Sequence, residues 1–141
     1  MGAVSDVHVP FGTTDGEVLA KSLSVSAQAI PFVITIPIAG GAAAAVNFTV
    51  PEKIRVLDAW AVHTGGTGEA TDTLTVGNAA NAITDALDWS GADKAVVRAG
   101  TIDDAYHEIA RGGTLRVTTV DSDSGADVGA GIVYVLAVKV K

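Results

Sequence analysis

Large apolar residues recur at every second position near the start of the sequence. In residues 29–39 the isoleucines and the phenylalanine all share one parity, and two prolines share the other. Because side chains of a β-strand point alternately to opposite faces, this pattern predicts a strand with one buried face. Pro31 and Pro37 have no amide hydrogen and leave the same side of the strand without donors, so we predict an edge strand. Its buried face would carry Ile30, Phe32, Ile34, Ile36 and Ile38.

Two further strands are predicted in the segment Lys53–Asn78. Residues 53–64 and 72–77 alternate in the manner of strands, and the glycine-rich residues 65–71 separate them. We interpret the pair as a hairpin, which needs more strands to bury its apolar face. One parity of the first strand is apolar apart from Asp58, and this row predicts that Trp60 lies in the core. The row is Ile54, Val56, Trp60 and Val62.

Short alternating runs continue to the end of the chain. Residues 79–89 fit both a helix and a strand, and their place after a strand favours extended structure. Residues 101–111 have the signals of a helix, with a threonine cap, acids in the first turn and two glycines after the end. The sum predicts an all-β, jelly-roll-like β-sandwich with one short helix. The other predicted strands are 45–50, 95–99, 114–120 and 132–141, the last with Ile132, Tyr134, Leu136, Val138 and Val140 facing the core.

Domain organisation follows from length and periodicity. Residues 1–29 show no sustained period and are predicted to form an N-terminal arm or a partly ordered extension, whereas residues 30–141 form the β-sandwich domain. The chain has 141 residues, no cysteine, 48% hydrophobic residues and only 18% charged ones. A domain of this size can hold its own core, but so few charges predict that part of its surface is buried between subunits.

Charge and hydropathy exclude two classes of partner. The formal net charge of −7 disfavours nucleic acid, whose phosphates require clusters of Lys and Arg. Residues 22–51 carry no charge, but prolines, paired glycines and polar residues interrupt them, so we do not expect a membrane-spanning helix. The sequence does not begin with basic residues followed by an apolar run, so we expect no secretory signal.

The sequence contains no complete catalytic or metal-binding set, so we expect neither an enzyme nor a cofactor or metal site. Asp103, Asp104, His107 and Glu108 cluster, but acids at a helix start complement its dipole, and no nucleophile accompanies them. Residues 121–127 alternate carboxylates as a calcium loop does, yet lack the later glutamate, and ion binding there stays open. Trp89 fits either the core or stacking on a sugar, which leaves a carbohydrate-binding or fibre module as the alternative function.

Several stretches resemble head decoration, or cement, proteins of tailed bacteriophages, over roughly residues 54–141. The resemblance implies a structural virion protein that forms a trimer of jelly-roll subunits. It further implies that the trimer sits on the outer capsid surface, where it binds the major capsid protein and staples neighbouring capsid subunits. The stretches that carry it are Val56–Trp60, Gly65–Gly66, Asp72–Asn78, Ala99–Tyr106 and Gly112–Val117.

Candidate residues for binding the capsid or another partner lie in the arm and in the edge strand. An arm can bind an adjacent molecule by adding a strand to its sheet, and many weak contacts on a repeated lattice give high avidity. In the arm the candidates are Val7, Val9 and Phe11. In the edge strand they are Pro31, Phe32, Val33 and Pro37.

Overall fold

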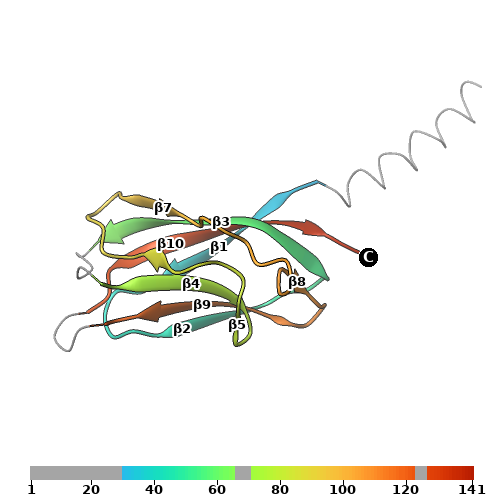
Figure 1. Ribbon diagram of the computed structural model, residues 1–141, viewed down its shortest axis with the longest axis horizontal. Helices are drawn as coiled ribbons and strands as arrows, with labels where there is room; N and C mark the ends of the chain where they lie inside the picture. The colour runs from blue at the N-terminus through green and yellow to red at the C-terminus, as the bar shows by residue number, and fades with distance from the viewer. Residues whose placement is uncertain (1–29, 66–70, 123–126) are drawn as a thin grey trace, which may run out of the picture. The chain divides into compact units, whose positions relative to one another are not determined.

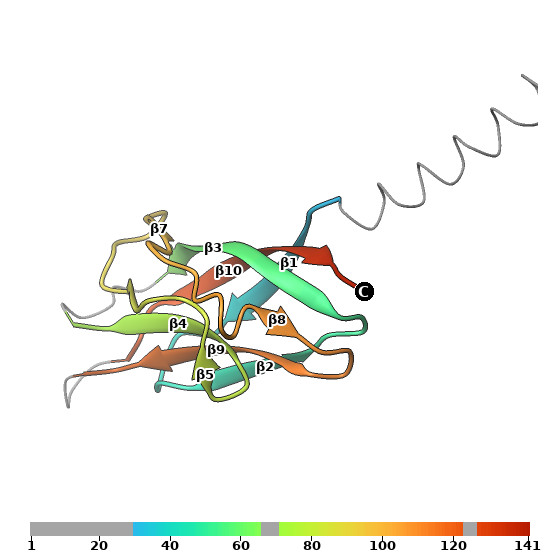
Figure 2. The ribbon, with the colours of Figure 1, turned by 45° about the vertical axis from the view of Figure 1, so that its right-hand side comes forward.

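Two antiparallel sheets pack face to face in the computed structural model, which describes residues 30–65, 71–122 and 127–141 (Figures 1 and 2). The described residues contain strands, turns and loops but no helix, so this part of the chain is an all-β sandwich. Sheet 1 has the order β1 (Phe32–Ile38), β10 (Ala130–Lys139), β3 (Ile54–Gly65) and β7 (Val96–Arg98), with β8 (Glu108–Ile109) also paired to β3. Sheet 2 has the order β2 (Ala45–Thr49), β9 (Thr114–Val120), β4 (Thr73–Asn78) and β5 (Asn81–Ala82), with β6 (Leu87–Asp88) paired to β4.

Early strands pair with late ones. β1 pairs with β10 and β2 pairs with β9, while β3 and β4 lie on the far side of β10 and β9. This nested pairing is the winding of a jelly roll. Residues Pro31–Lys141 form one compact unit. The predicted arm, with Val7, Val9 and Phe11, lies outside the described residues, and its division from the sandwich stays a prediction.

The predicted edge strand is confirmed. β1 pairs with β10 alone, and Ile34, Ile36 and Ile38 are buried. Ile30 was placed on the same row, but it precedes β1 and is 59% exposed. The apolar row therefore extends past the part of the chain that pairs.

The predicted hairpin is wrong, although both of its strands exist. β3 pairs with β10, β7 and β8 in sheet 1, and β4 pairs with β9, β5 and β6 in sheet 2. The connection between them thus joins two sheets instead of two neighbours in one sheet. Alternation shows that each strand has a buried face, but it does not show whether two such faces lie side by side or opposite each other.

The predicted core position of Trp60 is also wrong, because β3 contains a bulge. Val56 pairs with Ala137 and Asp58 with Leu136, so Leu57 is an extra residue without a partner on β10. One extra residue exchanges the two faces of the rest of the strand. Beyond the bulge the buried residues are Ala59, Ala61 and His63, while Trp60 and Val62 are half-buried on the opposite face.

The face assigned to the last strand is reversed. Val133, Val135 and Ala137 of β10 are fully buried, whereas the predicted row is only half-buried on the other face. Both parities of β10 are apolar, so alternation could not decide which of them faces the core. The half-buried row consists of Ile132, Tyr134, Leu136 and Val138.

The segment predicted as a helix forms a turn and a short strand. The carbonyl of Asp103 accepts a hydrogen bond from the amide of His107 (3.1 Å), and its carboxylate accepts one from the amide of Ala105 (2.8 Å). A carboxylate that binds its own backbone in this way competes with helix formation. The chain then pairs with β3, where the amide of Val56 donates to the carbonyl of His107 (2.8 Å). Long-range pairing has therefore overridden the local helix signals.

The preference for extended structure in residues 79–89 is confirmed by β5 and β6. Trp89, which follows β6, is 0% exposed, and its Nε1 donates a hydrogen bond to the carbonyl of Gly129 (2.9 Å). Its indole therefore belongs to the core and presents no face for stacking on a sugar.

Candidate binding surfaces

The outer face of sheet 1 is apolar over three of its rows, and the strand register shows how its side chains are arranged; a further row, Val138, Arg55 and Glu108, carries an ion pair. One row across the sheet joins Thr35, Tyr134, Trp60 and Arg98, and the rings of Trp60 and Tyr134 stack with centroids 5.6 Å apart. Direct neighbours on adjacent strands interact in this way. A second row joins Pro37, Ile132, Val62 and Val96, and a third joins Val33, Leu136 and Asp58. We call these eleven residues the apolar face.

Solvent still reaches the apolar face. Val96 is 67% exposed and Val33 is 47% exposed, and a shallow depression of about 410 Å³ lies among Asp58, Trp60, Val96, Arg98 and Leu136. Arg98 forms an ion pair with Asp58. These are the only charged residues of the face, so its formal charge is zero.

The outer face of sheet 2 has the opposite character. Its rows are mainly polar, and threonine is their commonest residue. Such a polar face is what an antiparallel sheet normally presents to water. The polar residues are Thr49, Thr73, Thr75, Thr114, Thr118, Asn47 and Arg116, and the apolar Ala45 and Val120 lie in the same rows. Both sheets bury an apolar inner face, so only their outer faces differ.

A pocket lies at the edge of the sandwich where β1 and β2 approach each other. Its volume is about 370 Å³, and its lining is apolar apart from Thr35, Glu52 and Lys139. Of the four residues predicted on the edge strand, Phe32 and Val33 line it, whereas Pro31 precedes β1 and Pro37 lies on the apolar face. The remaining lining residues are Ile34, Phe48, Val50, Pro51 and Ile54.

Beside this pocket, β2 presents an unprotected edge. The amide of Val50 donates to Gly113 (3.0 Å) and the carbonyl of Ala44 accepts from Thr119 (3.0 Å), so the even-numbered residues of β2 face β9. The amides and carbonyls of the odd-numbered residues Ala45, Asn47 and Thr49 therefore point away from the sheet. β2 contains neither a proline nor a charge, the usual means of protecting an edge.

The edge of β1 is protected. Val140 donates to the carbonyl of Lys53 (3.1 Å), so the even-numbered residues of β10 face β3 and the odd-numbered ones face β1. The register then directs Val33, Thr35 and Pro37 of β1 to the open side. Pro37 has no amide hydrogen, so β1 offers only two backbone donors, those of Val33 and Thr35, to an added strand. The prolines identify the edge of β1 in the sequence, whereas the sequence signal for the edge of β2 is the absence of charge and proline in residues 45–49, which was not recognised.

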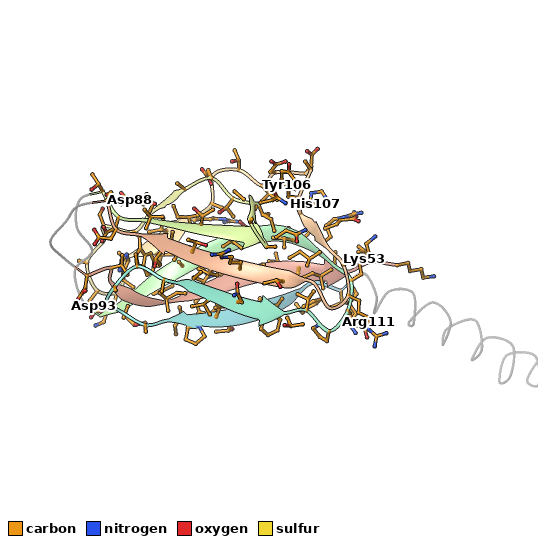
Figure 3. All side chains as sticks on the ribbon, turned by 90° about the horizontal axis from the view of Figure 1, so that it is seen from below. Lys53, Asp88, Asp93, Tyr106, His107 and Arg111 are labelled. Carbon is orange, nitrogen blue, oxygen red and sulfur yellow. The ribbon has the colours of Figure 1, made fainter. Side chains whose placement is uncertain are left out.

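Charged side chains gather at both ends of the sandwich, away from any common pocket. Figure 3 shows Asp88 and Asp93 at one end and Lys53, Tyr106, His107 and Arg111 at the other. Glu108 pairs with Arg55 (2.5 Å) and Lys53 (3.0 Å), and these hydrogen bonds lower the pKa of Glu108 to about 2. It is therefore ionised at neutral pH and held as a surface ion pair, which suits neither a general acid nor a base. The carboxylate of Asp103 accepts a hydrogen bond from the amide of Ala105 within its own turn.

No group of three or more His, Asp or Glu side chains that would hold a metal ion occurs in residues 30–65, 71–122 and 127–141. The loop predicted as an alternative ion site lies partly outside these ranges, at residues 123–126. The same ranges contain no helix long and apolar enough to cross a membrane.

His63 is buried on the inner face of β3 at the end of the sandwich that carries Asp88 and Asp93. Its ring stacks on Trp89 with centroids 3.7 Å apart, and neither ring nitrogen has a hydrogen-bond partner among the described residues. Burial lowers the pKa of His63, and the charges of Asp88 and Asp93 oppose this shift. The histidine is therefore held neutral as part of the core.

No protein-family model matches the sequence, and the comparison with curated proteins found no match. Two solved structures resemble the fold. One is a chain of the cyanophage Pam1 capsid asymmetric unit, with 20% identity over 79% of this chain and 84% of that chain and a TM-score of 0.46. The other is from the structure of infectious bursal disease virus, Gx strain, with 12% identity over 78% of this chain and 33% of that chain and a TM-score of 0.37. At this level of similarity neither structure assigns a function to the chain.

Proposed function

We propose that this chain is a structural protein of a virion that decorates and cements the outer capsid surface as a trimer. Its activity would be binding to the major capsid protein, without catalysis. The observation that carries the proposal is the open edge of β2 beside an apolar pocket. The resemblance of residues 54–141 to decoration proteins supports the same role.

The edge and the pocket together suit an extended segment of a capsid subunit. A strand added to β2 would exchange hydrogen bonds with the outward-facing amides and carbonyls of Ala45, Asn47 and Thr49. Its alternate side chains would point between the sheets, towards Phe48 and Phe32. A pocket of about 370 Å³ has room for one or two large apolar side chains. Recognition would therefore require an apolar residue at every second position of the incoming segment.

Repetition of this contact would supply the strength of a cement. One added strand contributes few hydrogen bonds, but a trimer engages several capsid subunits at once and gains avidity. The predicted arm would add a further contact through Val7, Val9 and Phe11. Deleting residues 1–20 should therefore weaken capsid binding while the sandwich stays folded.

The test uses capsids assembled without this chain from the genome that encodes it. Asn47→Pro removes an outward-facing amide and breaks no bond to β9, and Asn47→Ala is the matched control that keeps the amide. We expect Asn47→Pro to weaken capsid binding at least about 10-fold and Asn47→Ala to leave it unchanged. Equal binding of the two variants would contradict the role of the edge. Absence of the chain from purified particles, measured by mass spectrometry, would overturn the proposed function.

A further inference from the structure

The apolar face is built as one surface, not as scattered exposed residues. Its three rows run across β1, β10, β3 and β7, and apolar side chains occupy eight of the eleven positions. Single exposed apolar residues are normal, whereas a contiguous patch marks an interaction site. The outer face of sheet 2 serves as the internal reference, since the same chain gives that face to water.

The composition of the apolar face is that of an interface core. Tryptophan, tyrosine and arginine are the residues most enriched at the centres of protein interfaces, and Trp60, Tyr134 and Arg98 lie in a single row here. Charged residues are depleted at such centres, and this face has only the paired Asp58 and Arg98. Four strands about 4.8 Å apart span roughly 14 Å, which is enough for the core but not the rim of a standard interface.

The charges of the face favour a second copy of the chain as the occupant. The chain has a formal charge of −7, so two copies repel each other over most of their surface. The apolar face is the exception, because Asp58 and Arg98 cancel. Two copies that meet there can also exchange partners, with Arg98 of each copy beside Asp58 of the other, so the face is complementary to itself.

We propose that copies of this chain associate through the apolar face, with Trp60 and Tyr134 at the centre of the contact and Asp58 and Arg98 paired between copies. The inference does not rest on the number of copies in the proposed function, because a face that is complementary to itself joins copies in pairs about a twofold axis, and a trimer would need a further contact. The contact itself requires no capsid.

The first experiment measures the mass of the full chain in solution by sedimentation and light scattering. We expect an oligomer at about 50 µM and a monomer for Trp60→Glu at the same concentration. The matched control, Thr118→Glu, places the same charge on the outer face of sheet 2 and should leave the oligomer intact. A monomeric wild-type chain overturns the inference, and so does an oligomeric Trp60→Glu variant that is folded by circular dichroism.

The second experiment tests the exchanged ion pairs. Asp58→Arg makes the charges of the face entirely positive, and Arg98→Asp makes them entirely negative. Each variant alone should associate at least about 10-fold more weakly than wild type, and an equimolar mixture should recover most of the lost affinity as a mixed oligomer. A mixture that associates no better than its components overturns the pairing between copies.

Other occupants give different results. If residues 1–29 of the same chain covered the face, the wild type would be monomeric and Trp60→Glu would lower its melting temperature. If a capsid subunit covered it, the wild type would be monomeric and Trp60→Glu would lose capsid binding. Both results overturn the inference. Failure of the proposed function is distinct, because a chain absent from particles can still form oligomers that Trp60→Glu dissociates.

Discussion

The two sheets of the sandwich bury similar inner faces but present opposite outer faces. On β9, alternation places Leu115 and Val117 in the core and Arg116 and Thr118 outside. On β10, both parities are apolar, a pattern that strands show when both of their faces are covered. The described residues supply a covering layer for only one of those faces. This difference is what we expect if sheet 2 is complete in one copy and sheet 1 is completed by another copy, as proposed above.

The largest expected effect comes from replacing apolar residues on the outer face of sheet 1 by threonine, the commonest residue on the outer face of sheet 2. Val62→Thr, Ile132→Thr and Leu136→Thr together remove apolar area from the centre of the apolar face, and threonine is as suitable for a strand as the residues it replaces. We expect association to weaken by roughly 100-fold or more, corresponding to about 3 kcal/mol, with the fold retained. Sedimentation velocity measures the first and circular dichroism the second. An unchanged oligomer would show that the contrast between the outer faces has no role in assembly.

A comparably large effect on folding is expected on the inner side of sheet 1. A Cβ at Gly131 would lie 2.4 Å from Cη2 of Trp89 and 2.6 Å from the carbonyl oxygen of Val62. Gly131→Ala should therefore lower the free energy of unfolding by about 3 kcal/mol, as expected for severe overpacking. Gly65→Ala is the control on the adjacent strand, since a Cβ there has no atom within 4 Å. Urea unfolding compares the two, and equal stability would mean that Trp89 moves aside.

A smaller effect should separate the inner from the outer threonines of sheet 2. Oγ1 of Thr119 accepts a hydrogen bond from the amide of Ala44 (3.0 Å) and donates one to its carbonyl (3.2 Å). Thr119→Val keeps the shape but removes both bonds, and should cost about 1 kcal/mol of stability. Thr118→Val, on the outer face, should change stability by less than about 0.5 kcal/mol. If thermal unfolding gives the same loss for both, the inner hydroxyl contributes nothing.

The smallest effect concerns pH. Because the pKa of His63 is lowered in the folded protein, the unfolded chain binds a proton first as pH falls below 6.5, and stability decreases there. His63→Phe keeps an aromatic ring beside Trp89 and removes this titration. Between about pH 8 and pH 6, the wild type should lose up to roughly 1 kcal/mol of unfolding free energy more than His63→Phe. The measurement compares the slopes of unfolding free energy against pH, so a loss of stability caused by the larger phenylalanine ring, which is the same at every pH, does not affect it. Identical slopes for variant and wild type would contradict a neutral, buried His63.

Sequence alone predicted the strands whose two faces differ in polarity. β1 and β9 lie within a few residues of their predicted limits, because the buried parity of each strand is almost wholly apolar, while the other parity carries Thr35 in β1 and Thr114, Arg116 and Thr118 in β9. For β10 the sequence offered two apolar parities and no means to choose between them. For β3 it offered one clue, Asp58 within an apolar row, which marks the place where the bulge at Leu57 exchanges the faces. Trp60 was consequently assigned to the core, and the apolar face was not recognised.

Other errors arose where distant pairing decides the structure. Local signals in residues 101–111 favoured a helix, but pairing of Glu108 and Ile109 with β3 is a contact that no local rule describes. The segment 53–78 contained two good strands, and only the three-dimensional packing decides that they belong to different sheets. Of the predicted site residues, Phe32 and Val33 line the edge pocket. Phe48 and the edge of β2 were missed, because the lack of charge and proline in residues 45–49 acquires a meaning only when β2 is known to lie at the end of its sheet.

The unequal protection of the two edges has a consequence for growth. With donors missing at Pro37, one copy cannot stack on the next through β1, so a chain produced in large amounts cannot lengthen into a ribbon by that route. On the side of the sandwich formed by β1 and β2, the border of β2 can accept a foreign strand, while β1 offers no equivalent border for further addition. We therefore expect strand addition on this side to stop after one strand.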